Sequence, residues 1–172
     1  MTIKPIITEP NKILRQISQP VKKVGKEEQE LMNDMLETMY SANGIGLAAI
    51  QIGVPKRIIV MDISKDENKK EPRYFVNPII KNKDILKSTY EEGCLSVPNQ
   101  FAEIDGPKEG IIEYLDAHGE KKTLDAEGLL ATCIQHEMDH LEGILFIDYL
   151  SKLKKSMIVK KLSKMKSTRI IV

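Results

Sequence analysis

The sequence predicts an α+β fold, built from three helices and several short strands, in one domain over residues 1–172. The length suits a single compact domain, and the composition of 41% hydrophobic and 30% charged residues is that of an ordinary globular chain. Apolar residues recur at helical spacing in three segments, with short β-rich runs and turn signals between them. No repeat and no Gly/Ser/Pro-rich linker divides the chain.

The first helix is expected over residues 26–41. Its apolar side chains follow steps of one, three and four residues, and Asn43-Gly44 ends the pattern. Three of these side chains are methionines, namely Met32, Met35 and Met39. We expect this methionine stripe to pack in the core.

Short strands are expected next, in an antiparallel or mixed sheet. The β-rich runs are residues 47–52, 57–63, 74–80 and 85–91, separated by turn and loop residues. Later, residues 111–115 and 120–124 flank the turn sequence Asp-Ala-His-Gly. This arrangement predicts a hairpin.

The second helix is expected to begin near Asp125 and to end at Gly143. Asp125 is a suitable N-cap, and apolar residues recur at helical spacing after it. The third helix is expected over residues 151–166, and residues 151–172 together form a basic helix and tail with eight positive charges and no acid. Such a charge run is usually a solvated face, although it also favours a polyanion such as RNA.

Composition excludes several classes of protein. No apolar run approaches the roughly 18–20 residues that a membrane span needs, and the first thirty residues lack the apolar stretch of a secretory signal. We therefore expect no membrane association and a cytoplasmic location. Cys94 and Cys133 are the only cysteines, and in a reducing cytosol a core, metal-binding or catalytic role is more common than a disulfide.

The motif H-E-x-x-H, formed by His136, Glu137 and His140, lies within the second helix. Histidines four residues apart share one helix face and can bind one metal ion. Glu137 is then placed to act as general base toward a water that the metal activates. The alternative is a hydrogen-bonded pair of core histidines.

A catalytic site of this kind needs a third protein ligand. The position of a third histidine in one zinc-peptidase pattern is Phe146, and no acid lies beyond Asp148. Cys133 lies roughly 7.5 Å along the helix axis from the expected metal, which suits a wall of the site. Cys94, within the sequence Glu-Gly-Cys-Leu-Ser, remains as the candidate, against the alternative of a small buried residue. Gly93 permits a tight backbone there, and Leu95 supplies an amide.

A third motif begins with two glycines and ends in Gln51, over residues 44–51. It lacks the third glycine and the following helix of a dinucleotide site, so we expect no nucleotide cofactor. Gly44 and Gly46 allow close approach of a substrate, and Gln51 is a neutral donor that suits an oxyanion. The alternative is a buried strand whose Gln51 is satisfied by the backbone.

These three motifs, in this order, closely resemble those of the peptide deformylase family: G-x-G-L-A-A-x-Q, E-G-C-L-S and Q-H-E-x-D-H. The resemblance spans essentially the whole chain. It implies sheets wrapped around the central H-E-x-x-H helix, and removal of the formyl group from the N-terminal methionine of nascent proteins. It also implies one divalent metal on Cys94, His136 and His140, with Fe2+ expected and Zn2+, Ni2+ or Co2+ as other occupants. Glu137 would be general base and then acid, while Gln51 and the Leu95 amide would hold the oxyanion.

The same resemblance implies where a substrate would bind. Many family members carry an arginine seven residues after the cysteine ligand, near the path of the peptide, whereas this chain has Phe101. A basic C-terminal extension in the family is associated with ribosome docking. Two other functions use the same features: a different metal-dependent amidase or peptidase, and a non-catalytic ribosome-binding protein with a structural metal. The expected substrate-binding residues are Gly44, Ile45, Gly46, Tyr90, Glu92, Gly93, Leu129, Thr132 and Cys133, with the His136 ring at the edge of the methionine pocket.

Overall fold

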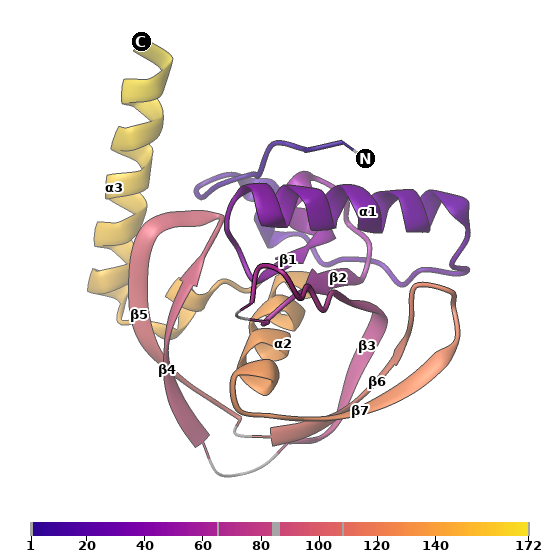
Figure 1. Cartoon of the computed structure of the whole chain (residues 1–172). Coiled ribbons are helices and arrows are strands. Elements are labelled where there is room, and N and C mark those ends of the chain that lie inside the picture. Colours follow the sequence, from indigo (N-terminus) through magenta and orange to yellow (C-terminus); the bar gives the residue numbers. More distant parts are fainter. Residues whose placement is uncertain (1, 65, 84–86, 108, 172) are drawn as a thin grey trace.

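The computed structural model describes residues 2–64, 66–83, 87–107 and 109–171 (Figure 1). Side chains are described for residues 2–64, 66–81, 89, 91–105 and 109–165. The helices are α1 Lys26–Ser41, α2 Gly128–Leu141 and α3 Lys152–Ile171, with short 3-10 turns η1 Lys12–Arg15, η2 Ala49–Ile52 and η3 Phe146–Tyr149. The strands are β1 Gly46–Ala48, β2 Ile58–Met61, β3 Arg73–Lys83, β4 Lys87–Cys94, β5 Val97–Pro107, β6 Glu109–Leu115 and β7 Lys121–Glu127.

The strands form two antiparallel sheets. One sheet has five strands in the order β1-β2-β3-β6-β7, and the other is the two-stranded β4–β5 hairpin. Helix α2 contacts β1, β2, β6 and β7 of the first sheet and β5 of the second. In Figure 1 it lies between the hairpin and the curved β3, β6 and β7 strands. The predicted α+β class, with three helices and antiparallel sheets, is confirmed.

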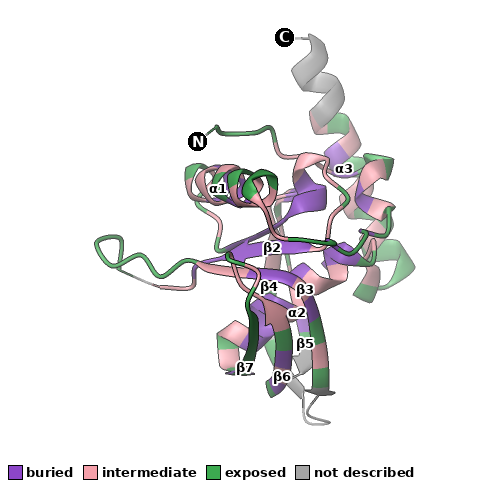
Figure 2. Ribbon diagram, turned by 90° about the vertical axis from the view of Figure 1, so that its right-hand side faces the viewer, coloured by how far each residue is buried: buried purple, intermediate pink, exposed green. Residues whose placement is uncertain are grey.

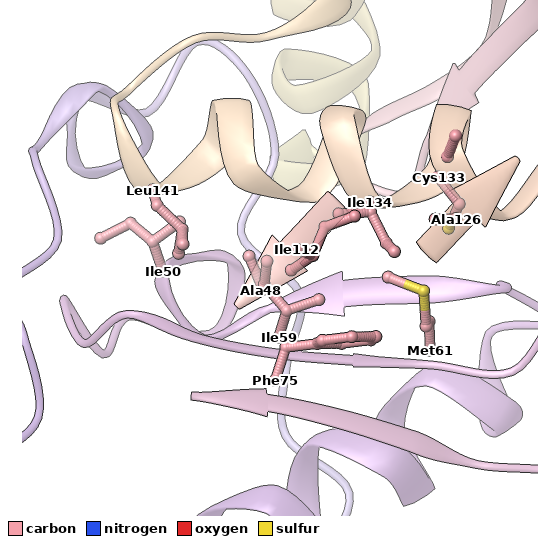
Figure 3. Packing of buried hydrophobic residues seen from close by; sticks show 11 residues of the cluster. Ala48, Ile50, Ile59, Met61, Phe75, Ile112, Ala126, Cys133, Ile134 and Leu141 are labelled. Carbon is pink, nitrogen blue, oxygen red and sulfur yellow. The ribbon is translucent and has the colours of Figure 1, made fainter. Parts of the chain in front are cut away.

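The core lies on both faces of the five-stranded sheet, as the burial of strand β2 shows. All four of its residues are buried, because Ile59 and Met61 face α2 while Ile58 and Val60 face α1. Figure 2 shows this strand as buried, and Figure 3 shows the side chains packed beneath α2. A strand covered on both faces has a continuous apolar sequence.

Helix α1 has the predicted bounds, and its methionine stripe is part of the core. Met32, Met35 and Met39 are at most 1% exposed and pack against β1 and β2. Unbranched thioether side chains fill the irregular space between a helix and a twisted sheet well.

Three predictions of secondary structure need correction. Residues 47–52 do not form one strand: β1 ends at Ala48, and η2 turns the chain until Gly53, which has a φ of +87°. Asp125 does not cap α2, because its pairing with Ile111 extends β7 to Glu127, and α2 begins at Gly128. Strand β5 was not predicted.

The other predicted strands exist with shifted ends. Strand β2 is shorter than the predicted 57–63, β3 is longer than 74–80, and the β6–β7 hairpin is confirmed. Strand β4 runs from Lys87 to Cys94 instead of 85–91, and residues 84–86 lie outside the described part of the chain.

Helix α3 begins at Lys152, close to the predicted start, and extends beyond residue 166. Leu162 is buried against β5, whereas Leu153 and Met157 are exposed. Within the described residues, no helix is both long and apolar enough to cross a membrane. Cys94 and Cys133 are both free cysteines.

Candidate metal centre

Three side chains with metal-ligand chemistry meet between α2 and the end of β4. The Nε2 atoms of His136 and His140, one turn apart on α2, are 3.2 Å apart. The Sγ atom of Cys94 lies 3.3 Å from His140 Nε2. The three ligand atoms all lie within 4.8 Å of one another. The sequence therefore predicted three groups that the fold brings together.

This cluster fits a divalent cation. Atoms bound at about 2.0–2.3 Å to one tetrahedral metal lie roughly 3–4 Å apart, as the His136–His140 and Cys94–His140 pairs do. Burial lowers the pKa of His140 well below its usual value, which keeps the imidazole neutral, the form that binds metal. Burial alone also lowers the pKa of His136, but hydrogen bonding to Cys94 and Glu92 outweighs it and raises that pKa. The groups around His136 thus stabilise a positive charge at this position, whether the protonated ring or a bound cation carries it.

Glu92 orients one of the histidines. Its Oε1 atom lies 3.0 Å from His136 Nδ1, so the other ring nitrogen faces Cys94 and His140. A carboxylate behind a ligating histidine fixes its tautomer and ring orientation. Glu92 was expected to contact substrate, and this contact with His136 was missed. The signal was available, since residues two apart on a strand, as Glu92 and Cys94 are, share one face.

Glu137 is a buried carboxyl beside the cluster. The residue is 4% exposed, its Oε1 lies 3.9 Å from His136 Nε2, and its Oε2 has no hydrogen-bond partner among the described residues. Burial raises the pKa of Glu137 to about 7, opposed by His136 and reinforced by Glu92 and Asp139. A carboxyl that exchanges its proton near neutral pH suits general acid–base catalysis.

Gln51 is fixed with its donor end toward the cluster. Its Oε1 accepts from the Ala48 amide at 2.9 Å, while its Nε2 donates to Ser96 Oγ at 3.0 Å and lies 3.6 Å from Cys94 Sγ. The sequence left open that backbone groups satisfy the Gln51 amide. This holds only for its acceptor oxygen, because its donor nitrogen bonds to a side chain. Leu95 follows Cys94 directly and lines the adjoining cavity.

A cavity of about 540 Å3 opens beside these groups. Burial raises the pKa of Cys133 well above its usual value, so its thiol stays protonated and forms a wall, as predicted. Tyr90 lies on β4, but its side chain is outside the described part. Predicted residues that line the cavity are Gly44, Ile45, Gly46, Gln51, Glu92, Gly93, Cys94, Leu95, Leu129, Thr132, Cys133, His136 and Glu137. Lining residues that were not predicted are Ala42, Asn43, Glu91, Pro98 and Asn99. Phe101, at the position that the resemblance placed near the peptide's path, also lines the cavity.

His118 lies in the predicted Asp-Ala-His-Gly turn after β6, where it is exposed.

A Cys/His/His cluster, a buried carboxyl with a pKa near neutrality and an adjoining cavity define a metal-dependent hydrolase.

Comparisons with known proteins identify which one. Residues 3–156 match the family described as polypeptide deformylase. A peptide deformylase of Pelagibacter ubique (strain HTCC1062) is 76% identical over 172 residues, the full length of both chains. The crystal structure of peptide deformylase from Ehrlichia chaffeensis superposes with a TM-score of 0.93 at 39% identity, covering 98% of this chain and 99% of that one.

A second Ehrlichia chaffeensis structure contains actinonin. It has a TM-score of 0.90 at 41% identity and covers 96% of this chain and 98% of that one. This chain belongs to the peptide deformylase family, whose members are metal-dependent hydrolases that remove the formyl group from the N-terminal methionine of nascent proteins.

Proposed function

We propose that residues 1–172 act as a single catalytic domain that hydrolyses the formamide of formyl-methionyl peptides, with one divalent cation, Fe2+, on Cys94, His136 and His140. The observation that carries this proposal is the position of the buried Glu137 carboxyl, whose Oε2 has no hydrogen-bond partner among the described residues, beside three converging ligand atoms. A closed structural metal site would use four protein ligands and would not need this carboxyl.

The cation supplies Lewis-acid activation of a water and of the formamide carbonyl when it is bound. A mixed thiolate and imidazole set also suits Zn2+, Ni2+ and Co2+, so the choice of Fe2+ rests on the family resemblance alone.

The chain's own groups move the protons and hold the developing charge. Glu137 accepts a proton from the attacking water and passes it to the leaving amine, giving formate and a free N-terminal methionine. The Gln51 Nε2 and the Leu95 amide donate to the carbonyl oxygen as it becomes negative. Ser96 and the Ala48 amide hold Gln51 in the orientation that this role needs.

The cavity suits an extended peptide. Within the described residues, β1 pairs only with β2 and β4 pairs only with β5, so each strand has a free edge, and residues from both line the cavity. A substrate backbone can pair with such edges. The methionine side chain would then enter the apolar part of the cavity, between Ile45, Leu129 and Cys133.

The test is formate release from formyl-Met-Ala, beside release of amino acids from unformylated peptides, by protein purified anaerobically. We expect formate from the formylated peptide only, with about one metal per chain by elemental analysis. Release of amino acids instead would indicate a peptidase. Bound metal without either product would indicate a structural metal in a non-catalytic protein.

We also propose that the protein acts in the cytoplasm and contacts ribosomal RNA through α3. The helix presents exposed lysines and no acid. Deleting α3 would uncover the core around the buried Leu162, so charge reversal is the cleaner test. The variant replaces four exposed lysines by glutamate: Lys152, Lys154, Lys160 and Lys161.

A matched control reverses exposed lysines elsewhere, at Lys22, Lys23, Lys69 and Lys121. We expect co-sedimentation with ribosomes to be salt-dependent and to be lost only in the α3 variant. Equal binding by both variants would contradict the proposed contact.

A further inference from the structure

The N-terminal segment connects two of the three sequence motifs. The Ile7 amide donates to the Gln51 carbonyl at 2.7 Å, and the Glu9 amide donates to the Ser96 carbonyl at 2.8 Å. Gln51 lies in η2, whereas Ser96 lies in the turn between β4 and β5. Residues 7–9, which we call the N-terminal strap, are therefore hydrogen-bonded through their backbone to both segments.

These two segments carry the groups that are proposed to hold the oxyanion. The Gln51 side chain and the Leu95 amide must both face one carbonyl oxygen of the substrate, so the distance between the two segments matters for catalysis. Within the described residues, no strand pairing joins the β4–β5 hairpin to the five-stranded sheet. The Gln51 side chain bonds to Ser96 Oγ, and the strap adds a backbone connection between the same two segments.

A buried ion pair attaches the strap to the end of α2. Glu9 is 6% exposed, and its Oε1 atom lies 3.1 Å from Nη2 of Arg15. Arg15 Nη1 donates to the Gly143 carbonyl at 3.2 Å, just beyond α2. A Cβ atom on Gly143 would overlap the Arg15 carbonyl oxygen, so the two backbones are in direct contact. Because a buried carboxylate is costly without a partner, Arg15 determines where Glu9 lies.

We propose that Glu9 is a positioning residue for the deformylation reaction. Its amide fixes the turn that carries Leu95, and its carboxylate fixes that turn relative to α2 through Arg15. The inference rests on the proposed hydrolysis of formyl-methionyl peptides. The oxyanion donors act mainly in the transition state, so a small displacement of the turn lowers kcat more than it changes KM.

The experiment compares Glu9→Gln with a matched control, Glu142→Gln. Glutamine keeps the length of the side chain and removes its charge. Glu142 pairs with Arg57 at 2.7 Å, at the same end of α2, in an ion pair that contains no residue of the strap or the hairpin. With formyl-Met-Ala and the metal-loaded protein, we expect Glu9→Gln to lower kcat about 10-fold. KM should change by less than about twofold, and Glu142→Gln should leave both constants unchanged.

Arg15→Lys tests the other half of the ion pair. Lysine keeps a charge beside Glu9 but cannot donate through a fork to Glu9 and to the Gly143 carbonyl. We expect a smaller fall in kcat than in Glu9→Gln. The double variant should fall no further than Glu9→Gln alone, because the two residues act as one unit. Full multiplication of the two single effects would overturn the connection through Arg15.

A second measurement does not depend on turnover. Cys94 directly precedes Leu95, so a displaced turn also moves the proposed thiolate ligand. Co2+ bound to a thiolate and two imidazoles absorbs visible light, and its absorption bands depend on the geometry of the ligands. We expect Glu9→Gln to bind about one Co2+ per chain with shifted bands, and Glu142→Gln to keep the bands of the unmodified chain.

The outcomes separate this inference from the proposed function. A Glu9→Gln variant that unfolds at a lower temperature but keeps kcat and the Co2+ bands would show that Glu9 only supports the fold, and would overturn the inference. Equal losses of kcat in Glu9→Gln and Glu142→Gln would overturn it as well, because any ion pair near the end of α2 would then have the same effect. Absence of formate from the unmodified chain would refute the proposed function instead, while the Co2+ bands would still report whether Glu9 positions the turn.

Discussion

The two walls of the cavity differ in how they are held. On the α2 wall, His140 is fully buried and Glu137 is 4% exposed, beneath the five-stranded sheet. On the hairpin wall, Glu92, Gly93 and Cys94 are only partly buried, in a sheet of two strands. Two of the three predicted metal ligands and the predicted base therefore lie on the densely packed wall. The hairpin wall is thinner and nearer to solvent.

Only one predicted metal ligand comes from the hairpin, so removing it is expected to have the largest effect. Cys94→Ala should lose the metal and reduce formate release to background, because two histidines alone leave the cation poorly held. Cys133→Ala, on the α2 wall, should keep about one metal per chain. Elemental analysis of both purified variants checks this. Metal loss from Cys133→Ala, with metal retained in Cys94→Ala, would show that Cys133 is the ligand and Cys94 is not.

On the α2 wall, Glu137→Gln should separate chemistry from metal binding. We expect kcat to fall about 10²- to 10⁴-fold, because the amide cannot accept the proton of the attacking water. Metal content should stay near one per chain. If the metal were lost together with the activity, Glu137 would be a ligand and not a base.

Two glycine substitutions compare the walls directly. A Cβ on Gly46 would lie 2.8 Å from Glu137 Oε1 and 3.1 Å from Cys133 Sγ, both buried on α2. Gly46→Ala should therefore displace the base, with a loss of activity of up to about 10²-fold and of about 1–3 kcal/mol of stability.

The same change on the hairpin clashes only with the ring of Phe101, which is exposed and can rotate away, while the Gln100 carbonyl oxygen lies at an ordinary contact distance of 3.6 Å. Gly93→Ala should cost less than about 1 kcal/mol of stability and should reduce activity less than Gly46→Ala does. Steady-state kinetics and thermal unfolding of both variants test this contrast. A larger activity loss in Gly93→Ala than in Gly46→Ala would show that the hairpin is the more rigid wall.

The smallest effect is expected where the α2 wall is braced from outside. Asp148, in η3, accepts from Arg15 at 2.5 Å and forms an ion pair with Lys155 at 2.7 Å. Arg15 also donates to the Gly143 carbonyl, just beyond α2. Burial alone raises the pKa of Asp148, but the bonds from Lys155, Arg15 and Leu145 lower it below its usual 3.8.

A lowered pKa gives stability that is present above the unfolded-state pKa and lost as the pH falls through the folded-state pKa. Asp148→Asn should therefore be less stable near neutral pH, by about 1–3 kcal/mol. It should also lose less stability than the unmodified chain as the pH falls below about 4. Urea unfolding across this pH range tests both statements. Parallel pH dependence in the two proteins would contradict the role of Asp148.

The sequence predicts the α2 wall well because its information is local. The four-residue spacing of His136 and His140 places both on one helix face, and the apolar run of β2 indicates burial on both sides. The hairpin is different. In β5 the exposed Phe101, Glu103 and Asp105 give little apolar periodicity, and the strand exists through its pairing with β4.

Orientation of single side chains depends on contacts that are distant in sequence. Gln51 is held by Ser96, 45 residues away, and His136 by Glu92, 44 residues away. Strand alternation can place Glu92 on the same face as Cys94, but no spacing within one segment names the partner, because each bond joins two segments that only the fold brings together. The end of β1 and the start of α2 were predicted wrongly for a related reason. Pairing with β2 decides where β1 ends, and pairing with β6 decides where β7 ends and hence where α2 begins.

The separation of the β4–β5 hairpin from the five-stranded sheet also bears on how this protein can change over evolutionary time. In the described chain, no ladder of strand hydrogen bonds joins the two sheets. Substitutions at outward-facing hairpin positions such as Phe101 can therefore accumulate without shifting the register of the strands packed against α2. A lineage can diverge at the hairpin while it inherits the groups on α2 intact, and an engineer can redesign the same few positions on an unaltered scaffold.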